Sequence, residues 1–285
     1  MSHIHFIDGT AYDADTFGET DATTGIWKPK TAPSVTYGTN GFFLKGENSG
    51  SLGTDSSGNA NNFTVNGTPT QTIDTPSNVF ATLNPLSSTT FPTFAHGNTQ
   101  TVISTSDSNG AIARGTMFVS KGKYYWEVKM TANSASVRNE IGVETADSMA
   151  SNIAVAGLFG TGKARGYRGD GLTIRDGNTT ASYGASYTNG DIIGVALDID
   201  AGTLVFYKNG VSQGTAFSDL TNDTWGIALG QANNTFQVNT GNGFFGTTAV
   251  ASAQNPDDGI GIFEYDVPTG YRALCTKSIN AQEYS

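Results

Sequence analysis

The sequence contains a single cysteine, Cys275, among 285 residues, and only 14% of its residues are charged. One cysteine excludes a disulfide within the chain and a metal cluster held by cysteine ligands. Basic residues are scarcer than acidic ones, and the net charge of −10 argues against a nucleic-acid partner and against docking on an anionic membrane. No hydrophobic run approaches the length of a membrane span, and the first residues lack the pattern of a signal peptide. We therefore expect no nucleic-acid binding, no membrane insertion and no export by a signal peptide.

Residues that favour helices are also sparse, and no segment shows a helical period or an internal repeat. Glycine occurs 36 times, and the polar residues are largely serine, threonine and asparagine. Glycine and asparagine tolerate the positive φ of tight turns, so this composition favours many short strands joined by turns. The sequence predicts an all-β protein.

Strand patterns are dense after about residue 115. Tyr124, Trp126, Val128 and Met130 alternate with Tyr125, Glu127 and Lys129, which predicts a strand with one buried face. Segment 191–199 is nearly all apolar and predicts a central strand covered on both sides. Segment 203–208 ends at Asn209-Gly210, a pair that favours a type I′ hairpin turn. Further strands are predicted at 225–229, 236–239 and 260–265.

The chain before this region is irregular, with short strand patterns at 4–7 and 41–45 and glycine- or proline-rich segments between them. We predict two parts: an extended N-terminal arm with a small β element at 1–85, and an antiparallel two-sheet sandwich at 86–285.

Several strand segments stand in the order found in one known domain. The segments Ser120–Val128 (SKGKYYWEV), Ile141–Val143 (IGV), Gly190–Asp198 (GDIIGVALD), Gly202–Gly210 (GTLVFYKNG), Gly214–Phe217 (GTAF) and Phe236–Gly241 (FQVNTG) resemble the SPRY (B30.2-like) domain. The resemblance implies a bent, jelly-roll-like β-sandwich, with Trp126 and Phe206 in its core. It also implies binding through loops at one end, without catalysis.

The N-terminal part resembles something narrower. Segments 6–12, 17–21, 25–29, 37–45 and 55–63 resemble a linker in virion proteins of marine tailed bacteriophages, where it often follows a laminin-G-like or concanavalin-like domain. This resemblance implies a tail-fibre or host-recognition protein in the virion, made in the host cytoplasm, that binds a cell-surface glycan or protein. It also implies a homo-oligomer and contacts with other virion subunits through residues 1–40.

Two other hypotheses remain open. In one, the chain is a structural virion component, such as a capsid decoration, head fibre or tail-tip subunit, that contacts only other virion proteins. In the other, it is an enzyme that degrades polysaccharides. No pair of carboxylates and no Gly-x-Ser-x-Gly motif is singled out by spacing, so we expect no catalytic residues and no enzyme activity.

A candidate ligand-binding segment gathers cations and tyrosines in a chain that is acidic as a whole. Tyrosine can stack on sugars or peptides, and arginine can bind carboxylates in a bidentate manner. Ordinary strand and turn content with partly buried tyrosines is the alternative interpretation. The candidate residues are Arg165, Tyr167, Arg168, Asp170, Arg175, Tyr183 and Tyr187.

Cofactor and metal motifs are incomplete. Segment 157–164 approaches a phosphate-binding loop, but Ala164 stands where serine or threonine would hold magnesium. His3 and His5 share a strand face without a third metal ligand. Oxygen-bearing side chains from Asp55 to Asn62 could surround calcium, although turns stabilised by Asp and Asn side chains explain them better. We expect no cofactor and no metal.

Overall fold

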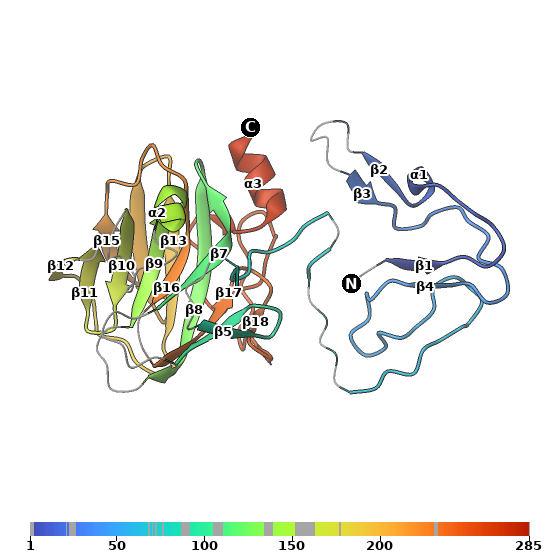
Figure 1. Cartoon of the computed structure of the whole chain (residues 1–285), viewed down its shortest axis with the longest axis horizontal. Coiled ribbons are helices and arrows are strands. Elements are labelled where there is room, and N and C mark those ends of the chain that lie inside the picture. Colours follow the sequence, from blue (N-terminus) through green and yellow to red (C-terminus); the bar gives the residue numbers. More distant parts are fainter. Residues whose placement is uncertain are drawn as a thin grey trace. The chain divides into compact units, whose positions relative to one another are not determined.

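The computed structural model describes residues 3–20, 22, 27–67, 69, 71, 73–75, 77–86, 92–104, 111–133, 139–151, 163–176, 178–230 and 233–284. The chain forms two compact units, Met1–Val79 and Phe80–Ser285 (Figure 1). Within the described ranges, no helix is both long and hydrophobic enough to span a membrane.

The N-terminal unit is built from two small antiparallel sheets, in which β1 pairs with β4 and β2 pairs with β3. Its elements are β1 (Ile4–Phe6), α1 (Ala14–Phe17), β2 (Gly18–Thr20), β3 (Trp27–Pro29) and β4 (Phe42–Leu44).

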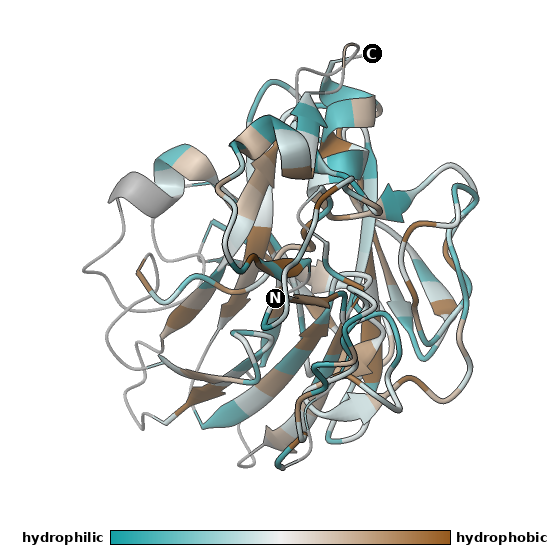
Figure 2. Ribbon diagram, turned by 90° about the vertical axis from the view of Figure 1, so that its right-hand side faces the viewer, coloured by the Kyte–Doolittle hydropathy of each residue, from teal (hydrophilic) through white to brown (hydrophobic). Residues whose placement is uncertain are grey.

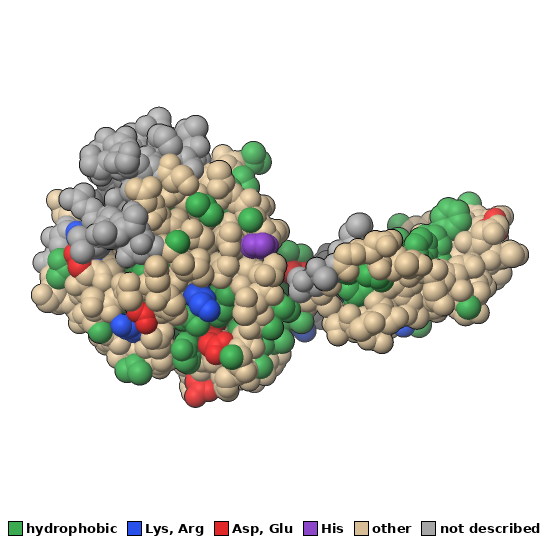
Figure 3. Space-filling model, turned by 90° about the horizontal axis from the view of Figure 1, so that it is seen from below, with side chains coloured by type: hydrophobic (Ala, Val, Ile, Leu, Met, Phe, Trp, Pro, Cys, Tyr) green, Lys and Arg blue, Asp and Glu red, His purple; other side chains and the backbone are tan. Residues whose placement is uncertain are grey.

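Aromatic packing holds one face of the β1–β4 pair. The ring of His5 stacks on Phe43 at a centroid distance of 4.0 Å, and its Nδ1 lies 2.8 Å from the Tyr37 hydroxyl. Figure 3 shows hydrophobic side chains (green) on the surface of the N-terminal unit. Among the described residues of this unit, the exposed large hydrophobic side chains are Phe6, Trp27, Phe63, Val65, Ile73 and Val79.

The loop after β4 is organised by the carboxylate of Asp55. Its oxygens accept hydrogen bonds from the backbone N–H groups of Phe43 (2.8 Å), Ser57 (2.8 Å) and Asn61 (2.9 Å), and from the Ser57 hydroxyl (2.8 Å). Each of the two carboxylate oxygens of Asp55 thus accepts two hydrogen bonds from within the unit. Turn stabilisation by the Asp55 side chain therefore explains this loop, in agreement with the alternative favoured by the sequence.

The second unit is an antiparallel sandwich of two sheets (Figure 1). The first sheet has the order β12-β11-β10-β9-β16-β7, and the second has the order β15-β14-β13-β8-β17-β6-β5, with β20 pairing parallel to β8. The strands are β5 (Pro92–Ala95), β6 (Gln100–Ile103), β7 (Ile112–Val119), β8 (Lys123–Asn133), β9 (Glu140–Thr145), β10 (Ala164–Arg168), β11 (Leu172–Arg175), β12 (Asn178–Ser182), β13 (Ile192–Asp198), β14 (Thr203–Lys208), β15 (Val211–Phe217), β16 (Trp225–Gly230), β17 (Asn234–Asn239), β18 (Phe244–Phe245), β19 (Thr248–Ala249) and β20 (Arg272–Ala273). The helices are α2 (Ala146–Ser151) and α3 (Thr276–Glu283). The all-β sandwich is thus confirmed.

The core lies between the two sheets, where alternate residues of each strand meet. Trp126 and Phe206 are completely buried there, as predicted. Figure 2 shows hydrophobic (brown) and hydrophilic (teal) segments alternating along the strands. The predicted hairpin is also present, because Asn209 (φ 48°) and Gly210 (φ 80°) both adopt the left-handed backbone of a type I′ turn between β14 and β15.

Three expectations from the sequence are wrong. Tyr125 and Glu127 do not face solvent, because the C-terminal strap, which we define as residues 241–275, covers the outer face of β8. Residues 260–265 belong to this strap and form isolated bridges instead of a regular strand. The C-terminal helix α3 was not predicted, and it is held by Glu283, which accepts hydrogen bonds from the Ser120 N–H (2.6 Å) and hydroxyl (2.8 Å).

A buried ion pair crosses the outer face of the first sheet. Arg114 on β7 contacts Glu144 on β9 through two hydrogen bonds of 2.8 and 3.3 Å, and both side chains are buried. Strand β16 lies between β7 and β9, with Ala228 opposite Arg114 and Gly226 opposite Glu144. Small residues at these two positions leave room for the arginine side chain to pass over β16.

Candidate functional site

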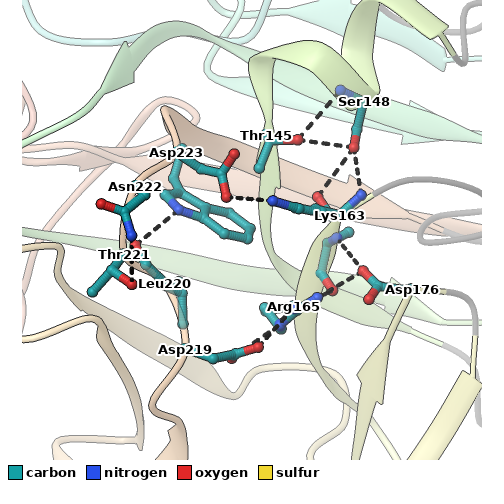
Figure 4. Close-up of polar contacts among 12 residues, drawn as sticks. Thr145, Ser148, Lys163, Arg165, Asp176, Asp219, Leu220, Thr221, Asn222 and Asp223 are labelled. Carbon is teal, nitrogen blue, oxygen red and sulfur yellow. Dashed lines mark hydrogen bonds and ion pairs between the residues drawn. The ribbon is translucent and has the colours of Figure 1, made fainter.

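The candidate site is built around the guanidinium of Arg165, near the start of β10 (Figure 4). Its Nη2 and Nε donate to the two carboxylate oxygens of Asp219 at 2.8 and 3.2 Å, and its Nη1 donates to Asp176 at 2.6 Å. Only 6% of the Arg165 side chain is exposed. A bidentate pair of this kind fixes the direction of both partners, so Arg165 holds the loop that carries Asp219 against β10.

Aromatic rings support this arrangement from inside the sandwich. The Arg165 guanidinium lies 5.9 Å from the ring centroid of Phe217 and 5.8 Å from that of Trp225. The indole N–H of Trp225 donates to the Leu220 carbonyl at 3.1 Å. Phe217 ends β15 and Trp225 begins β16, so the loop at 218–224 is held at both ends and in its middle.

A second ion pair lies at Lys163, in the connection between β9 and β10. The Lys163 ammonium contacts Asp223 at 2.8 Å, and the Lys163 N–H donates to the Ser148 hydroxyl at 2.5 Å. The Ser148 hydroxyl in turn lies 2.9 Å from that of Thr145, at the end of β9. These bonds tie the end of β9 to the start of β10 (Figure 4).

The charges in this region balance one another. Arg165, Arg175 and Lys163 pair with Asp176, Asp219 and Asp223. Hydrogen bonds from Arg165 and Arg175 lower the pKa of the Asp219 carboxyl against the opposing effect of its partial burial. Because each cation here already contacts a carboxylate, the region is suited to a polar partner and not to a strongly charged one. Its exposed loop residues are Ser218, Asp219, Thr221 and Asn222.

The structure separates the residues that the sequence grouped together. Arg165 and Arg175 meet at Asp219, whereas Arg168 lies at the far end of β10, where it pairs with Asp170 at 2.7 Å. Positions 165 and 168 are about 10 Å apart along an extended strand.

The candidate tyrosines line the sandwich interior. Tyr167 is fully buried and Tyr187 is 3% exposed. Tyr183 is half-buried and packs edge-on against Tyr167 at 5.2 Å. Burial raises the pKa of Tyr167 and of Tyr183 to about 12, so both hydroxyls are neutral at physiological pH. A ligand-binding role for the candidate residues stays a prediction, and the burial of Tyr167 and Tyr187 leaves those two rings no free face.

Sequence reasoning missed the carboxylates that complete the site, Asp176, Asp219 and Asp223. The polar run Ser218-Asp-Leu-Thr-Asn-Asp-Thr224 between two strands was the available signal. In the parts of the chain that the structure describes, no group of three histidine, cysteine, aspartate or glutamate side chains could hold a metal ion. Most of the segment resembling a phosphate-binding loop, 157–162, lies outside the described residues.

Comparison with known proteins defines the class of the sandwich. Residues 123–243 match the family model of the SPRY domain. The SPRY resemblance seen in the strand segments is therefore confirmed for residues 123–243.

Its relatives are eukaryotic proteins. The chain is 35% identical over 101 residues to Ran-binding protein 10 of Danio rerio, an alignment covering 35% of the chain and 16% of the relative. It is 35% identical over 101 residues to Ran-binding protein 9 of Homo sapiens, covering 35% of the chain and 13% of the relative. The matched region is thus a small part of these relatives.

Two solved structures are similar to the chain at low sequence identity. The SPRY domain of human HERC1 has a TM-score of 0.45 and 19% identity, and covers 55% of the chain and 96% of that structure. The TRIM65 PSpry domain has a TM-score of 0.43 and 17% identity, and covers 56% of the chain and 92% of that structure.

The bacteriophage interpretation of the N-terminal segments is wrong. The relatives include Ran-binding proteins 9 and 10 of fish, frogs and mammals, which are not virion proteins, and no match supports the tail-fibre resemblance. This finding overturns the expected virion location, the virion-subunit partners of residues 1–40, the host-cell receptor and the structural virion alternative. Glycine and asparagine are common in turns for reasons of backbone conformation, so turn-rich segments such as 37–45 and 55–63 do not by themselves identify a family.

Proposed function

We propose that the chain is a non-catalytic, protein-binding module that contacts a partner through the loop surface around Arg165. The observation that carries this proposal is the network in which Arg165 on β10 and Arg175 on β11 fix the 218–224 loop through Asp219. A loop held in this way loses little conformational entropy when a partner binds, which favours affinity. The SPRY domain match supports a binding role for the sandwich.

The chemistry of the surface favours a polar protein segment as the partner. Exposed hydroxyl and amide groups at Ser218, Thr221 and Asn222 can donate and accept hydrogen bonds, while the neighbouring charges are already paired. The sandwich interior is filled by large side chains such as Trp126 and Trp225, so binding at the surface is favoured over enclosure of a small molecule.

Selection from a random peptide library on the immobilised full chain tests this proposal. We expect enriched peptides whose affinity falls at least about tenfold for Thr221→Arg, because a long cation in the loop would obstruct the surface. The matched control is Thr269→Arg, on an exposed turn of the strap, which should bind these peptides like the wild type. No enrichment, or equal loss in both variants, would contradict the proposal.

The relatives are named Ran-binding proteins, so purified Ran is the first defined protein to titrate. Saturable binding that Thr221→Arg weakens and Thr269→Arg does not would identify a partner. If Ran does not bind, the outcome of the peptide selection decides whether the loop surface is a binding site.

A further inference from the structure

The part of the C-terminal strap around residues 263–265 forms a third layer over the outer face of the second sheet, and β20 near the end of the strap pairs with β8 within that sheet. Phe263 on the strap is fully buried against Tyr125 on β8, with ring centroids 5.1 Å apart. The buried side chains of this outer cluster are Phe80, Tyr125, Ala196, Phe263, Ala273 and Cys275. The sheet therefore has two hydrophobic faces, and the strap has to be in place for the outer one to be covered.

One carboxyl group from the sheet reaches into the strap. Glu127 is completely buried, and its two oxygens accept hydrogen bonds from consecutive backbone N–H groups, those of Glu264 and Tyr265, each at 2.9 Å. The Asn239 amide donates to it at 3.2 Å, and the Tyr125 hydroxyl lies 3.4 Å away. Glu127 thus binds the strap backbone directly, at the point where Phe263 enters the outer cluster.

Asn239, next to Glu127 on β17, extends this contact along the strap. Its side-chain oxygen accepts from the N–H groups of Gly241 (3.0 Å) and Gly243 (3.1 Å), and its amide donates to the Ile262 carbonyl at 3.0 Å. The two ends of the 241–265 segment are therefore held to one pair of side chains.

The ionisable groups that face Glu127 give it no opposite charge. The facing hydroxyls are those of Tyr125 on β8 and, farther away, Tyr265 on the strap; burial raises the pKa of both, so they are neutral near pH 7. Lys129, two residues along β8, places its ammonium 5.6 Å from the Phe245 ring. The Glu264 carboxylate accepts from the Ala251 N–H at 2.6 Å. Among the described residues, Glu127 forms no ion pair.

A deeply buried carboxyl group without a cation binds its proton more tightly than a free one. Burial raises the pKa of Glu127 from 4.5 to about 7, although the N–H donors of Glu264, Tyr265 and Asn239 act in the opposite direction. Lifting the strap would return the group to water and to its ordinary pKa. The attached strap is therefore favoured by protonation, and its attachment weakens as the pH rises from about 4.5 to about 7.

We propose that Glu127 is a protonation-dependent latch that holds the 241–265 segment on the outer face of the second sheet. Its release would expose the aromatic outer face around Tyr125 to solvent or to another molecule. This device is independent of the loop surface around Arg165.

Amide hydrogen exchange of the full chain at pH 6 and pH 8 tests the latch, after division by the intrinsic exchange rate at each pH. We expect the opening equilibrium of the Glu264 and Tyr265 amides to increase about tenfold between these pH values. The amides of Val143 and Ile227, in the other sheet, report global unfolding and should open far less often than those of Glu264 and Tyr265 at both pH values. A response of less than about twofold at Glu264 and Tyr265 would overturn the proposal.

Two variants separate the latch from general effects of pH. Glu127→Gln keeps the shape and an acceptor oxygen but cannot titrate, so its opening should be the same at both pH values. Glu264→Gln removes a neighbouring carboxylate and should keep the tenfold response. Retention of the response in Glu127→Gln, or its loss in Glu264→Gln, would overturn the latch. If Glu127→Gln does not fold, the wild type and Glu264→Gln still decide.

Discussion

Asp55 in the N-terminal unit and Glu127 in the sandwich have the same task, because each carboxylate organises a loop by accepting its backbone N–H groups. Each has four donors. Burial favours the neutral form of both, but the donors prevail at Asp55 and lower its pKa, whereas burial prevails at Glu127 and raises its pKa to about 7.

The two carboxyl groups differ in how deeply they are buried and in how short their hydrogen bonds are. Asp55 remains 8% exposed in a small unit and receives three backbone N–H groups at 2.9 Å or less. Glu127 is fully buried under a third layer, and two of its four donors lie at 3.2 and 3.4 Å. Hydrogen bonds alone therefore do not predict the charge of a buried carboxyl group, because the loss of water has to be weighed against them.

The largest expected effect comes from removing the Glu127 acceptor. Glu127→Ala leaves the buried N–H groups of Glu264 and Tyr265 without partners and should destabilise the sandwich by about 3 kcal/mol. Urea unfolding followed by the fluorescence of the buried Trp126 and Trp225 measures this change. Glu264→Ala is the control and should cost less than about 1 kcal/mol. Equal effects of the two substitutions would contradict the special role of Glu127.

The pH dependence of stability should separate the two carboxylates. Because the folded-state pKa of Glu127 is raised, the free energy of unfolding of the sandwich should increase by about 2 kcal/mol as the pH falls from 7 to 5. Glu127→Gln should abolish this increase. The lowered pKa of Asp55 has the opposite sign, so its stabilisation is present above pH 3.8 and is lost as the pH falls through its folded-state value. Urea titrations at each pH give the comparison, and a stability of the wild-type sandwich that does not change from pH 7 to 5 would contradict it.

Asp55→Ala should affect only the N-terminal unit. We expect a loss of about 1–2 kcal/mol there, because the Phe43 and Ser57 amides lose their acceptor. Amide exchange at Phe43 and Ser57 measures the loss, and strand β13 of the sandwich serves as the control. Increased exchange in β13 as well would show that the effect is not local.

The smallest effect is expected at the candidate binding surface. Asp219→Asn should destabilise the sandwich by about 0.5–1 kcal/mol, because Arg165 keeps Asp176 and the Asp219 side chain is 37% exposed. Thermal unfolding at low and high salt measures it, and the difference from the wild type should shrink in high salt. A loss larger than that of Glu127→Ala would mean that the ion pairs matter more than the strap.

The sequence predicts the parts of the fold that depend on neighbours along the chain. Asn209-Gly210 determines its own turn by backbone preference, and the alternation from Tyr124 to Met130 places Trp126 in the core. The opposite face of the same strand was predicted incorrectly because its cover arrives from residue 263, far along the chain. A strand pattern with Glu and Lys on one face looks the same whether water or a strap lies over it.

The candidate site around Arg165 is less predictable, because its partners also come from residues distant in the sequence. Arg165 stood out as a cation among tyrosines, but its partner Asp219 is 54 positions away and one of many acidic residues. The pattern around Tyr167 suggested a recognition surface, whereas Tyr167 is fully buried in the interior of the sandwich. Only the strand pairing shows which of these side chains reach the surface.

The ion pair that crosses β16 links four positions on three strands. A Cβ atom at Gly226 would lie 2.8 Å from the Phe118 ring, and a larger side chain at Ala228 would stand in the path of Arg114. Loss of Arg114 or Glu144 would remove the two hydrogen bonds between them, and a larger side chain at 226 or 228 would crowd the side chains that pack over β16. These residues should therefore change together or not at all, so covariation among positions 114, 144, 226 and 228 is expected wherever the sandwich keeps this pair.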